Sequence, residues 1–156
     1  MKNFRQKHST GKQKDLQLKI PLVTKYMVNV GNLITFREDT PMTEVLDGLL
    51  SNKITGAPVL NDKKEVVGLI DDKDCLDILV GGAYYNHPMG KDKVSTYMSN
   101  VMKSISTDSD VLIAATIFMT TPYKRLLVMD HNGKLAGQIS RRDILRAIKD
   151  MDANTW

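Results

Sequence analysis

The sequence predicts a mixed α/β (α+β) fold in which two β-α-β-β-α modules pack sheet to sheet with pseudo-twofold symmetry. The main observation is an internal repeat at an offset of 69 residues: 54–60 (ITGAPVL) aligns with 123–129 (YKRLLVM), and 68–74 (GLIDDKD) aligns with 137–143 (GQISRRD). A register kept over this much chain indicates that one structural unit occurs twice. A unit of about 60 residues buries too little apolar surface to be stable alone, so the two copies should pack on each other.

Each copy carries the same order of predicted elements. A cap residue followed by proline, Thr40-Pro41, predicts a helix with proline at its first position, and Asn132-Gly133 is a strong hairpin signal. The elements of the first copy are an amphipathic start at 23–27, a strand at 33–36, a helix from 40, strands at 57–60 and 66–70, and a helix from 71. Those of the second are a start at 94–98, a strand at 103–106, a helix over 111–119, strands at 126–129 and 135–139, and a helix from 140.

Helical spacing selects the candidate core residues. The first helices of the two copies supply Met42, Val45, Leu46, Leu49 and Leu50, and Val111, Leu112, Ala115, Phe118 and Met119. The last helices supply Leu76, Leu79 and Val80, and Ile144, Leu145 and Ile148, with Gly81-Gly82 expected to end the first of them. Apolar residues spread around the helix at 111–119, so some should face another surface. We therefore expect a homodimer.

Composition and charge exclude several classes of protein. The chain has 156 residues, of which 42% are hydrophobic and 26% charged, as in ordinary globular proteins. The longest apolar run, 111–119, is too short to span a bilayer, and no apolar segment follows the basic start. The single cysteine excludes an internal disulfide and a cysteine-cluster zinc site. These observations favour a cytoplasmic protein without a membrane anchor.

The net charge of +4 comes from one end of the chain. Residues 1–21 hold six basic side chains and one acidic side chain, whereas the rest of the chain holds 16 basic and 17 acidic ones. Such a segment is expected to be flexible, and it serves either as a solubilising extension or as a contact for an acidic partner or nucleic acid. The predicted organisation is a tail at 1–21, a module at 22–81, a linker at 82–92, a module at 93–150 and a C-terminal tail at 151–156.

The hairpin residues resemble those of the cystathionine-β-synthase (CBS) domain family. Residues 58–61 (PVLN) and 66–74 (VVGLIDDKD) are similar to that family's Pro-Val-Val-Asp … Gly-Ile-Val-Thr-x-x-Asp core, and residues 127–130 (LVMD) and 137–143 (GQISRRD) are similar again. The resemblance covers about residues 22–150 and implies a tandem CBS pair, or Bateman module, of the stand-alone kind. It further implies a sensor that binds an adenosine-containing ligand between its modules.

Residues 140–143 (SRRD) lie where a strand is expected to turn into a helix. The unpaired backbone N–H groups of a helix N-terminus favour phosphate, Ser140 could donate to a phosphate oxygen, and Arg141 and Arg142 add positive charge. Asp143 could accept hydrogen bonds from ribose hydroxyls. The same Ser-x-x-Asp spacing is also that of a capping box, so a purely structural role remains open.

The resemblance implies that the opposite module holds the base in this primary site. Ile54, Thr55 and Gly56 would supply an apolar wall and backbone hydrogen bonds, with Ile139 on the other side. Gly56 permits close approach of a ligand to the backbone. Plain core packing is the alternative for Ile54.

A second site, related by the repeat, departs from this pattern. Its residues would be Tyr123, Lys124, Arg125, Ile70, Asp71 and Asp74. Asp71 stands where the primary site has a hydroxyl, and a carboxylate there repels phosphate while still capping the helix. We expect this site to be empty, with a ligand lacking phosphate or a metal-dependent ligand as the alternatives.

Other chemistry-bearing residues do not form a constellation. His8, His87 and His131 are far apart and are expected to be solvated rather than to bind metal, and Cys75 is expected to be a packed thiol. The aromatic segment at 84–88 (YYNHP) is expected to cover a core edge or an oligomer contact. No phosphate-binding P-loop or hydrolase nucleophile motif occurs, so no catalytic residue is predicted.

The function expected from the sequence is therefore that of a regulatory module and not of an enzyme. It would bind an adenine nucleotide (AMP, ADP or ATP), need no cofactor and act on an effector protein that the sequence does not identify. Two other functions remain open: an interaction or scaffold protein with a vestigial cleft, and a nucleic-acid-associated protein that acts through residues 1–21. The last would bind with a steep dependence on salt.

Overall fold

The computed structural model describes residues 19–85 and 92–155, and it confirms a mixed α/β fold with two β-α-β-β-α units. The first unit comprises β2 (Phe36–Arg37), α2 (Met42–Ser51), β3 (Gly56–Leu60), β4 (Val66–Asp71) and α3 (Asp72–Tyr85). The second comprises β5 (Ser104–Ser106), α5 (Val111–Thr120), β6 (Arg125–Met129), β7 (Leu135–Ser140) and α6 (Arg141–Thr155). Short elements precede each unit: η1 (Val23–Lys25), β1 (Val28–Asn29) and η2 (Val30–Asn32) in the first case, and α4 (Val94–Tyr97) in the second.

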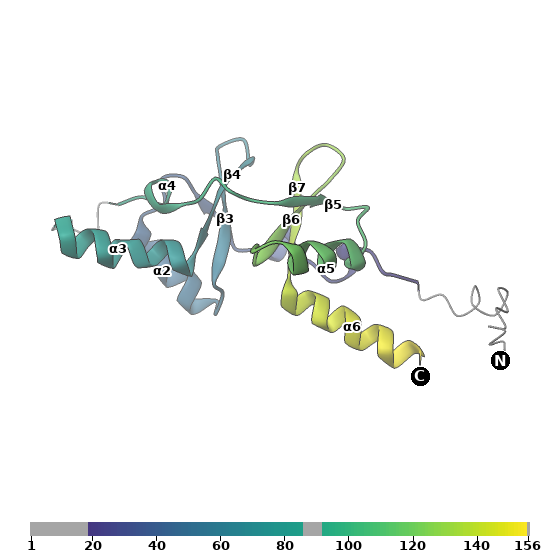
Figure 1. Cartoon of the computed structure of the whole chain (residues 1–156). Helices are drawn as coiled ribbons and strands as arrows, with labels where there is room; N and C mark the ends of the chain where they lie inside the picture. Colours follow the sequence, from purple (N-terminus) through teal and green to yellow (C-terminus); the bar gives the residue numbers. More distant parts are fainter. Residues whose placement is uncertain (1–18, 86–91, 156) are drawn as a thin grey trace, which may run out of the picture.

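Two small sheets lie at the centre of the molecule, with the helices of each unit on the outer sides (Figure 1). In each sheet the hairpin strands are antiparallel and the first strand of the unit joins them in parallel, as β2 pairs with β3 and β5 with β6. The β3–β4 and β6–β7 hairpins stand side by side with their turns at the same edge (Figure 1). Gly133 has the positive φ of 73° that a tight turn requires, which confirms the Asn-Gly hairpin.

The segments that precede the two units are exchanged between them. β1 pairs with β7 of the second unit, so that Val28 lies opposite Gln138, and Ser99 pairs with Leu69 of β4 in the first unit. These two pairings are equivalent under the repeat, since their residues differ by 71 and 69. β1 therefore extends the sheet of the second unit, and an isolated bridge ties Ser99 to the edge of the first sheet, so backbone hydrogen bonds join the two units.

The exchange also builds the two hydrophobic cores. Val23 and Tyr26 belong to the core of the second unit, whereas Val94 belongs to the core of the first. The hydroxyl of Tyr26 donates to Asp150 at the far end of α6, at 2.8 Å. Neither core is complete without the chain that precedes the other unit, so the two units should fold together.

The outward faces of the helices differ from the sequence prediction. On α3 the buried residue is Ile78, while Leu76, Leu79 and Val80 are 65–74% exposed. The remaining predicted core residues that are exposed are Leu50, Leu112, Met119, Leu145 and Ile148. Each helix rests on one side of a sheet and buries a single stripe, so apolar residues outside that stripe face outward.

Two predicted helix boundaries are also wrong. α3 continues through Gly81-Gly82 to Tyr85, because Gly81 keeps helical backbone instead of the left-handed conformation that ends helices. Pro41 has an extended ψ of 143° and is the N-cap of α2, not its first helical residue, while the hydroxyl of Thr40 accepts a hydrogen bond from the N–H of Arg37. The strand expected at 33–36 is instead the two-residue strand Phe36–Arg37.

Several predictions concern residues outside the described ranges. They include His8, His87 and nearly all of the basic tail, as well as residues 86–88 of the aromatic segment. Within residues 19–85 and 92–155, no helix is long and apolar enough to cross a membrane. The same ranges hold no group of three or more His, Cys, Asp or Glu side chains that could bind a metal ion.

Candidate functional site

The primary cavity is a cleft of about 420 Å³ at the end of the strands opposite the hairpin turns. Six of the seven predicted primary-site residues line it: Ile54, Thr55, Gly56, Ser140, Arg142 and Asp143. Residues 54–56 lead into β3, which begins at Gly56, and the others come from the junction of β7 and α6. The structure thus brings together two segments that are 84 residues apart at Gly56 and Ser140. The seventh residue, Ile139, is fully buried in the core behind the cavity and does not line it.

The start of α6 forms a reciprocal cap. Oδ2 of Asp143 accepts hydrogen bonds from the backbone N–H and the hydroxyl of Ser140 at 2.8 and 3.0 Å. Oδ1 of Asp143 accepts from Nη2 of Arg146 at 2.7 Å, and Nη2 of Arg146 also donates to the carbonyl of Tyr26 at 2.9 Å. The capping contacts expected of Ser-x-x-Asp are therefore present. They hold the carboxylate in one orientation at the wall of the cavity.

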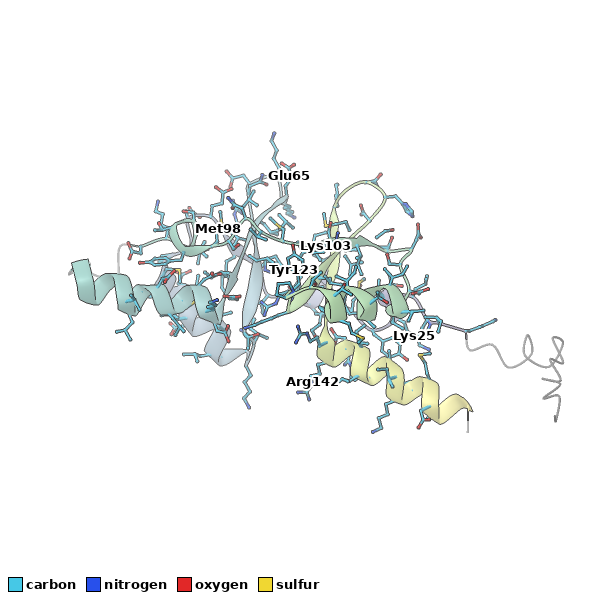
Figure 2. All side chains as sticks on the ribbon, viewed as in Figure 1. Lys25, Glu65, Met98, Lys103, Tyr123 and Arg142 are labelled. Atoms are coloured by element: carbon cyan, nitrogen blue, oxygen red, sulfur yellow. The ribbon has the colours of Figure 1, made fainter. Side chains whose placement is uncertain are left out.

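Positive charge dominates the wall of the primary cavity. Its lining includes one carboxylate, that of Asp143, and five cationic side chains: Lys53, Lys124, Arg125, Arg141 and Arg142. Figure 2 shows Arg142 at the beginning of α6. The guanidinium of Arg141 lies 6.0 Å from the ring centre of Phe118 and donates to the carbonyl of Tyr123 at 3.4 Å. This arrangement suits an anionic ligand.

Lys53 contributes to this charge at some cost to its backbone. It has a φ of 53°, in the left-handed region that non-glycine residues rarely adopt. The other described non-glycine residue with a positive φ is Lys64, in the β3–β4 turn. Lys53 follows the end of α2, where glycine or asparagine is the usual residue. The side chain placed there is a cation at the rim of the cavity.

The second cavity has a volume of about 320 Å³ and is the pseudo-twofold equivalent of the first. Five of the six predicted second-site residues line it: Tyr123, Lys124, Arg125, Asp71 and Asp74. Ile70, like its equivalent Ile139, is fully buried. Tyr123 lies in the region where the two units meet (Figure 2).

Carboxylates occupy the start of α3 where the start of α6 has a hydroxyl. Oδ1 of Asp71 accepts from the N–H of Asp74 at 2.9 Å, and Oδ2 of Asp74 accepts from the N–H of Asp71 at 3.1 Å. Burial raises the pKa of Asp74, and the charge of Asp71 raises it further. Nζ of Lys124 lies 3.6 Å from Oδ1 of Asp72. Part of the positive charge of this cavity is therefore already balanced within the chain.

Sequence reasoning missed the residues that precede β2. Val28, Asn32, Leu33 and Ile34 line the primary cavity, next to Gln138 of β7. They lie in the exchanged start of the first unit, near the point where the offset between the copies changes from 71 to 69. The equivalent segment before β5 lines the second cavity through Ser99 and Val101, so both exchanged starts contribute to a cavity wall. The signal that could have found these residues is the two-residue insertion, which marks the first start as different from the second.

Two other candidate residues lie apart from these cavities. Burial raises the pKa of Cys75 to about 11, and the charges of Asp74, Asp71 and Asp72 act in the same direction. The thiolate is therefore disfavoured at neutral pH, as expected of a packed thiol. Nε2 of His131 lies 3.3 Å from Oδ2 of Asp108, and both side chains are exposed.

Comparison with known proteins identifies the family. The model of the CBS domain matches residues 23–81 and 94–150. The chain is 32% identical over 148 residues to the CBS domain-containing protein CBSX1, chloroplastic, of Arabidopsis thaliana, covering 76% of this chain and 63% of that relative. It is 26% identical to CBSX2 of the same plant, of which it covers 66%, so it spans less than two thirds of both relatives.

Solved structures show the same fold. The crystal structure of CBSX2 from Arabidopsis thaliana has a TM-score of 0.76 at 25% identity, with 87% of this chain and 99% of that chain covered. The structure of CBSX2 in complex with AMP has a TM-score of 0.73 at 27% identity, with 85% and 98% covered. With both of its repeated units matched by the family model, the chain belongs to the CBS domain family and carries two CBS domains in tandem.

Proposed function

We propose that this chain is a regulatory module that binds an adenosine-containing ligand, AMP, ADP or ATP, in the primary cavity. The observation that carries the proposal is the cavity wall, in which five cationic side chains and a helix N-terminus converge from both CBS domains. The similarity to CBSX2, whose structure was solved with AMP, supports an adenine nucleotide in particular. The same wall disfavours a vestigial cleft, since an unused cavity has no need of so much positive charge.

Each predicted residue has a role in this proposal. Ser140 and the first N–H groups of α6 contact phosphate, with Arg142 adding charge, and Asp143 accepts from ribose hydroxyls. Residues 54–56 contact the base, and the buried Ile139 supports the strand beneath it. Phosphate-bearing ligands leave the second cavity empty, because Asp71 and Asp74 occupy the start of α3.

The ligand acts by changing an equilibrium and not by undergoing a reaction. A molecule held between two domains favours the arrangement that it binds best, by an amount limited to its difference in affinity for the two arrangements. In this proposal the chain is not an enzyme and requires no cofactor. An effector protein would recognise the ligand-bound arrangement. We place the protein in the cytoplasm, although the relatives CBSX1 and CBSX2 are named as chloroplastic.

A homodimer is part of the proposal because the outer helix faces are apolar. Leu76, Leu79 and Val80 of α3 and Leu145 and Ile148 of α6 are each more than half exposed. Contiguous apolar surface of this kind marks protein interfaces. Light scattering at tens of micromolar should give twice the chain mass, and Leu79→Glu should lower it toward the monomer if α3 forms the interface. A monomeric mass for the unaltered chain would contradict the dimer.

Thermal unfolding in the presence of a nucleotide panel tests the ligand. A ligand at 100 times its dissociation constant should stabilise the chain by about 2.7 kcal/mol. AMP, ADP and ATP should raise the unfolding temperature, whereas GMP at the same concentration is the control for non-specific binding of phosphate. The absence of any shift with all three adenine nucleotides would contradict the proposed function. A shift with a nucleic acid that disappears on deletion of residues 1–18 would favour the tail-based alternative.

A further inference from the structure

Arg125 occupies the point where the two CBS domains meet. It is the first residue of β6 and the equivalent of Gly56, the first residue of β3. A Cβ placed on Gly56 would overlap Nη1 of Arg125 and would lie 2.7 Å from its Cζ. The guanidinium therefore rests directly on the backbone of its own equivalent. One side chain fills the space that two symmetric residues would otherwise share.

One nitrogen of the Arg125 guanidinium, Nη1, is unused as a hydrogen-bond donor within the part of the chain that the structure describes. Arg125 is only 8% exposed, and its Nη2 donates to the hydroxyl of Thr55 at 2.8 Å. Nη1 is buried and makes no hydrogen bond to any residue that the structure describes. A buried donor without an acceptor is costly, so an oxyanion that reached Nη1 would bind favourably.

Arg125 lines the primary cavity and the second cavity alike. On the second side it faces the cluster of carboxylates at the start of α3. Burial lowers the pKa of Arg125, while the charges of Asp71, Asp72 and Asp74 oppose that change. The attraction of these carboxylates thus offsets part of the cost of burying the guanidinium. The same positive charge serves both cavities.

We propose that Arg125 couples the two cavities: the carboxylates of the second cavity restrain its guanidinium and thereby weaken the binding of phosphate in the primary cavity. This inference rests on the proposed function, since it concerns a phosphate-bearing ligand of that cavity. Asp71 sets the affinity of a site that it does not line. Arg125 is a positioning residue in this respect, through which a change in one cavity is transmitted to the other.

Calorimetric titration with AMP tests the coupling. Asp71→Asn removes one charge and keeps an oxygen that caps α3, and it should tighten AMP binding about two- to fivefold, as expected of one water-screened charge pair. Adenosine should bind with unchanged affinity. In an Arg125→Gln background, Asp71→Asn should have no further effect on AMP. Asp77→Asn, the same charge change later on α3, is the matched control and should leave affinity unchanged.

Three results would overturn the coupling: no tightening with Asp71→Asn, equal tightening with Asp77→Asn, or tightening that persists without Arg125. The third would mean that Asp71 acts on the ligand directly through its field. Titration of the same variants with inorganic pyrophosphate measures the affinity for the anion without a nucleoside. Coupling seen with pyrophosphate in a chain that does not bind AMP would contradict the proposed function alone.

A measurement without ligand makes the test independent of the nucleotide. The effects of Arg125→Gln and Asp71→Asn on the free energy of unfolding in urea should not be additive, because each removes a partner of the other. Asp77→Asn should be additive with Arg125→Gln. Additive effects for Asp71→Asn would overturn the coupling whatever binds in the primary cavity.

Discussion

The two cavities share one backbone arrangement but differ in charge: five cationic side chains and one carboxylate line the primary cavity, whereas three cationic side chains and two carboxylates line the second. Both lie where the last strand of a CBS domain turns into a helix, and both helices begin with a reciprocal cap: Ser140 with Asp143 in one, Asp71 with Asp74 in the other. Ser140 places a neutral hydroxyl in the primary cavity, whereas Asp71 places a carboxylate in the second cavity. The cap is therefore kept in both copies, whereas the charge of its first side chain differs between them.

A second difference lies at the contact between the equivalents Gly56 and Arg125. A symmetric pair of arginines would not fit, because one guanidinium already lies on the backbone of Gly56. A symmetric pair of glycines would leave the centre of the cleft without a cation. A buried cation at this point is therefore compatible with only one arginine, and Arg125 lines both cavities.

The largest effect on stability should appear where the exchanged starts pair with β7 and β4. Gly137→Ala should destabilise the chain by about 3 kcal/mol, because its Cβ would overlap the carbonyl oxygen of Val28 in the paired strand β1. Gly68→Ala, its equivalent, should cost less, since its Cβ would lie 2.7 Å from Sδ of Met98, the flexible part of a side chain, and 3.1 Å from the carbonyl oxygen of Ser99. Urea denaturation measures both. Equal losses would show that the two exchanges are equally tight.

Substitution of Asp143 and of its equivalent Asp74 should have different effects on the affinity for AMP. Asp143→Ala should weaken AMP binding about tenfold or more, because a hydrogen bond to a charged group contributes about 1.5–3 kcal/mol. Asp74→Ala, the same change at the second cavity, should not weaken it. Titration calorimetry is the measurement, with circular dichroism to show that each variant is folded. An unchanged affinity of folded Asp143→Ala would remove Asp143 from the site.

Replacing the cap residue Ser140 with aspartate, as at the second cavity, should make the primary cavity unfavourable for phosphate. Ser140→Asp should weaken AMP binding about tenfold, which corresponds to about 1.4 kcal/mol, with larger losses for ADP and ATP and almost none for adenosine. Stability without ligand should change little, since Asp caps a helix as well as Ser. Calorimetry with adenosine as the control tests the role of Ser140. A loss for adenosine as large as that for AMP would show that Ser140 does not contact phosphate.

The smallest effect should come from Asp74 and depend on pH. Because the pKa of Asp74 is raised in the folded chain, the folded state binds this proton more tightly than the unfolded state does. Its favourable contribution is therefore present below the ordinary Asp pKa and lost as pH rises through the raised value. Asp74→Asn should slightly stabilise the chain at pH 7 and not at pH 3, as measured by urea denaturation at both pH values. Stabilisation at both pH values would assign the effect to something other than titration.

Much of the architecture was predictable because it depends on local spacing. The repeat located two units, the Asn-Gly pair located a hairpin, and the strand-to-helix junction at Ser140 located one wall of the primary cavity. The family resemblance, which the residues of the two hairpins carry, implied that residues 54–56 form the opposite wall. The ligand contacts of these residues stay a prediction, since the cavity shows only that they lie together.

The outer helix faces show where local spacing is insufficient. Leu79 and Ile78 are adjacent and equally apolar, yet one is exposed and the other buried. Helical periodicity finds an apolar stripe only when the other face is polar, and α3 carries apolar residues on both. Which face meets the sheet is decided by packing.

The sequence by itself determined the duplicated unit, its order of elements and the positive charge at the start of α6, because these depend on residues within a few positions of each other. Only the tertiary structure decided that the two starts are exchanged and that Arg125 serves both cavities. The hydrogen bond from Arg125 to Thr55 joins residues 70 positions apart, and Val28 pairs with Gln138 across most of the chain. Such contacts form only when both domains are folded against each other, so no local sequence pattern predicts them.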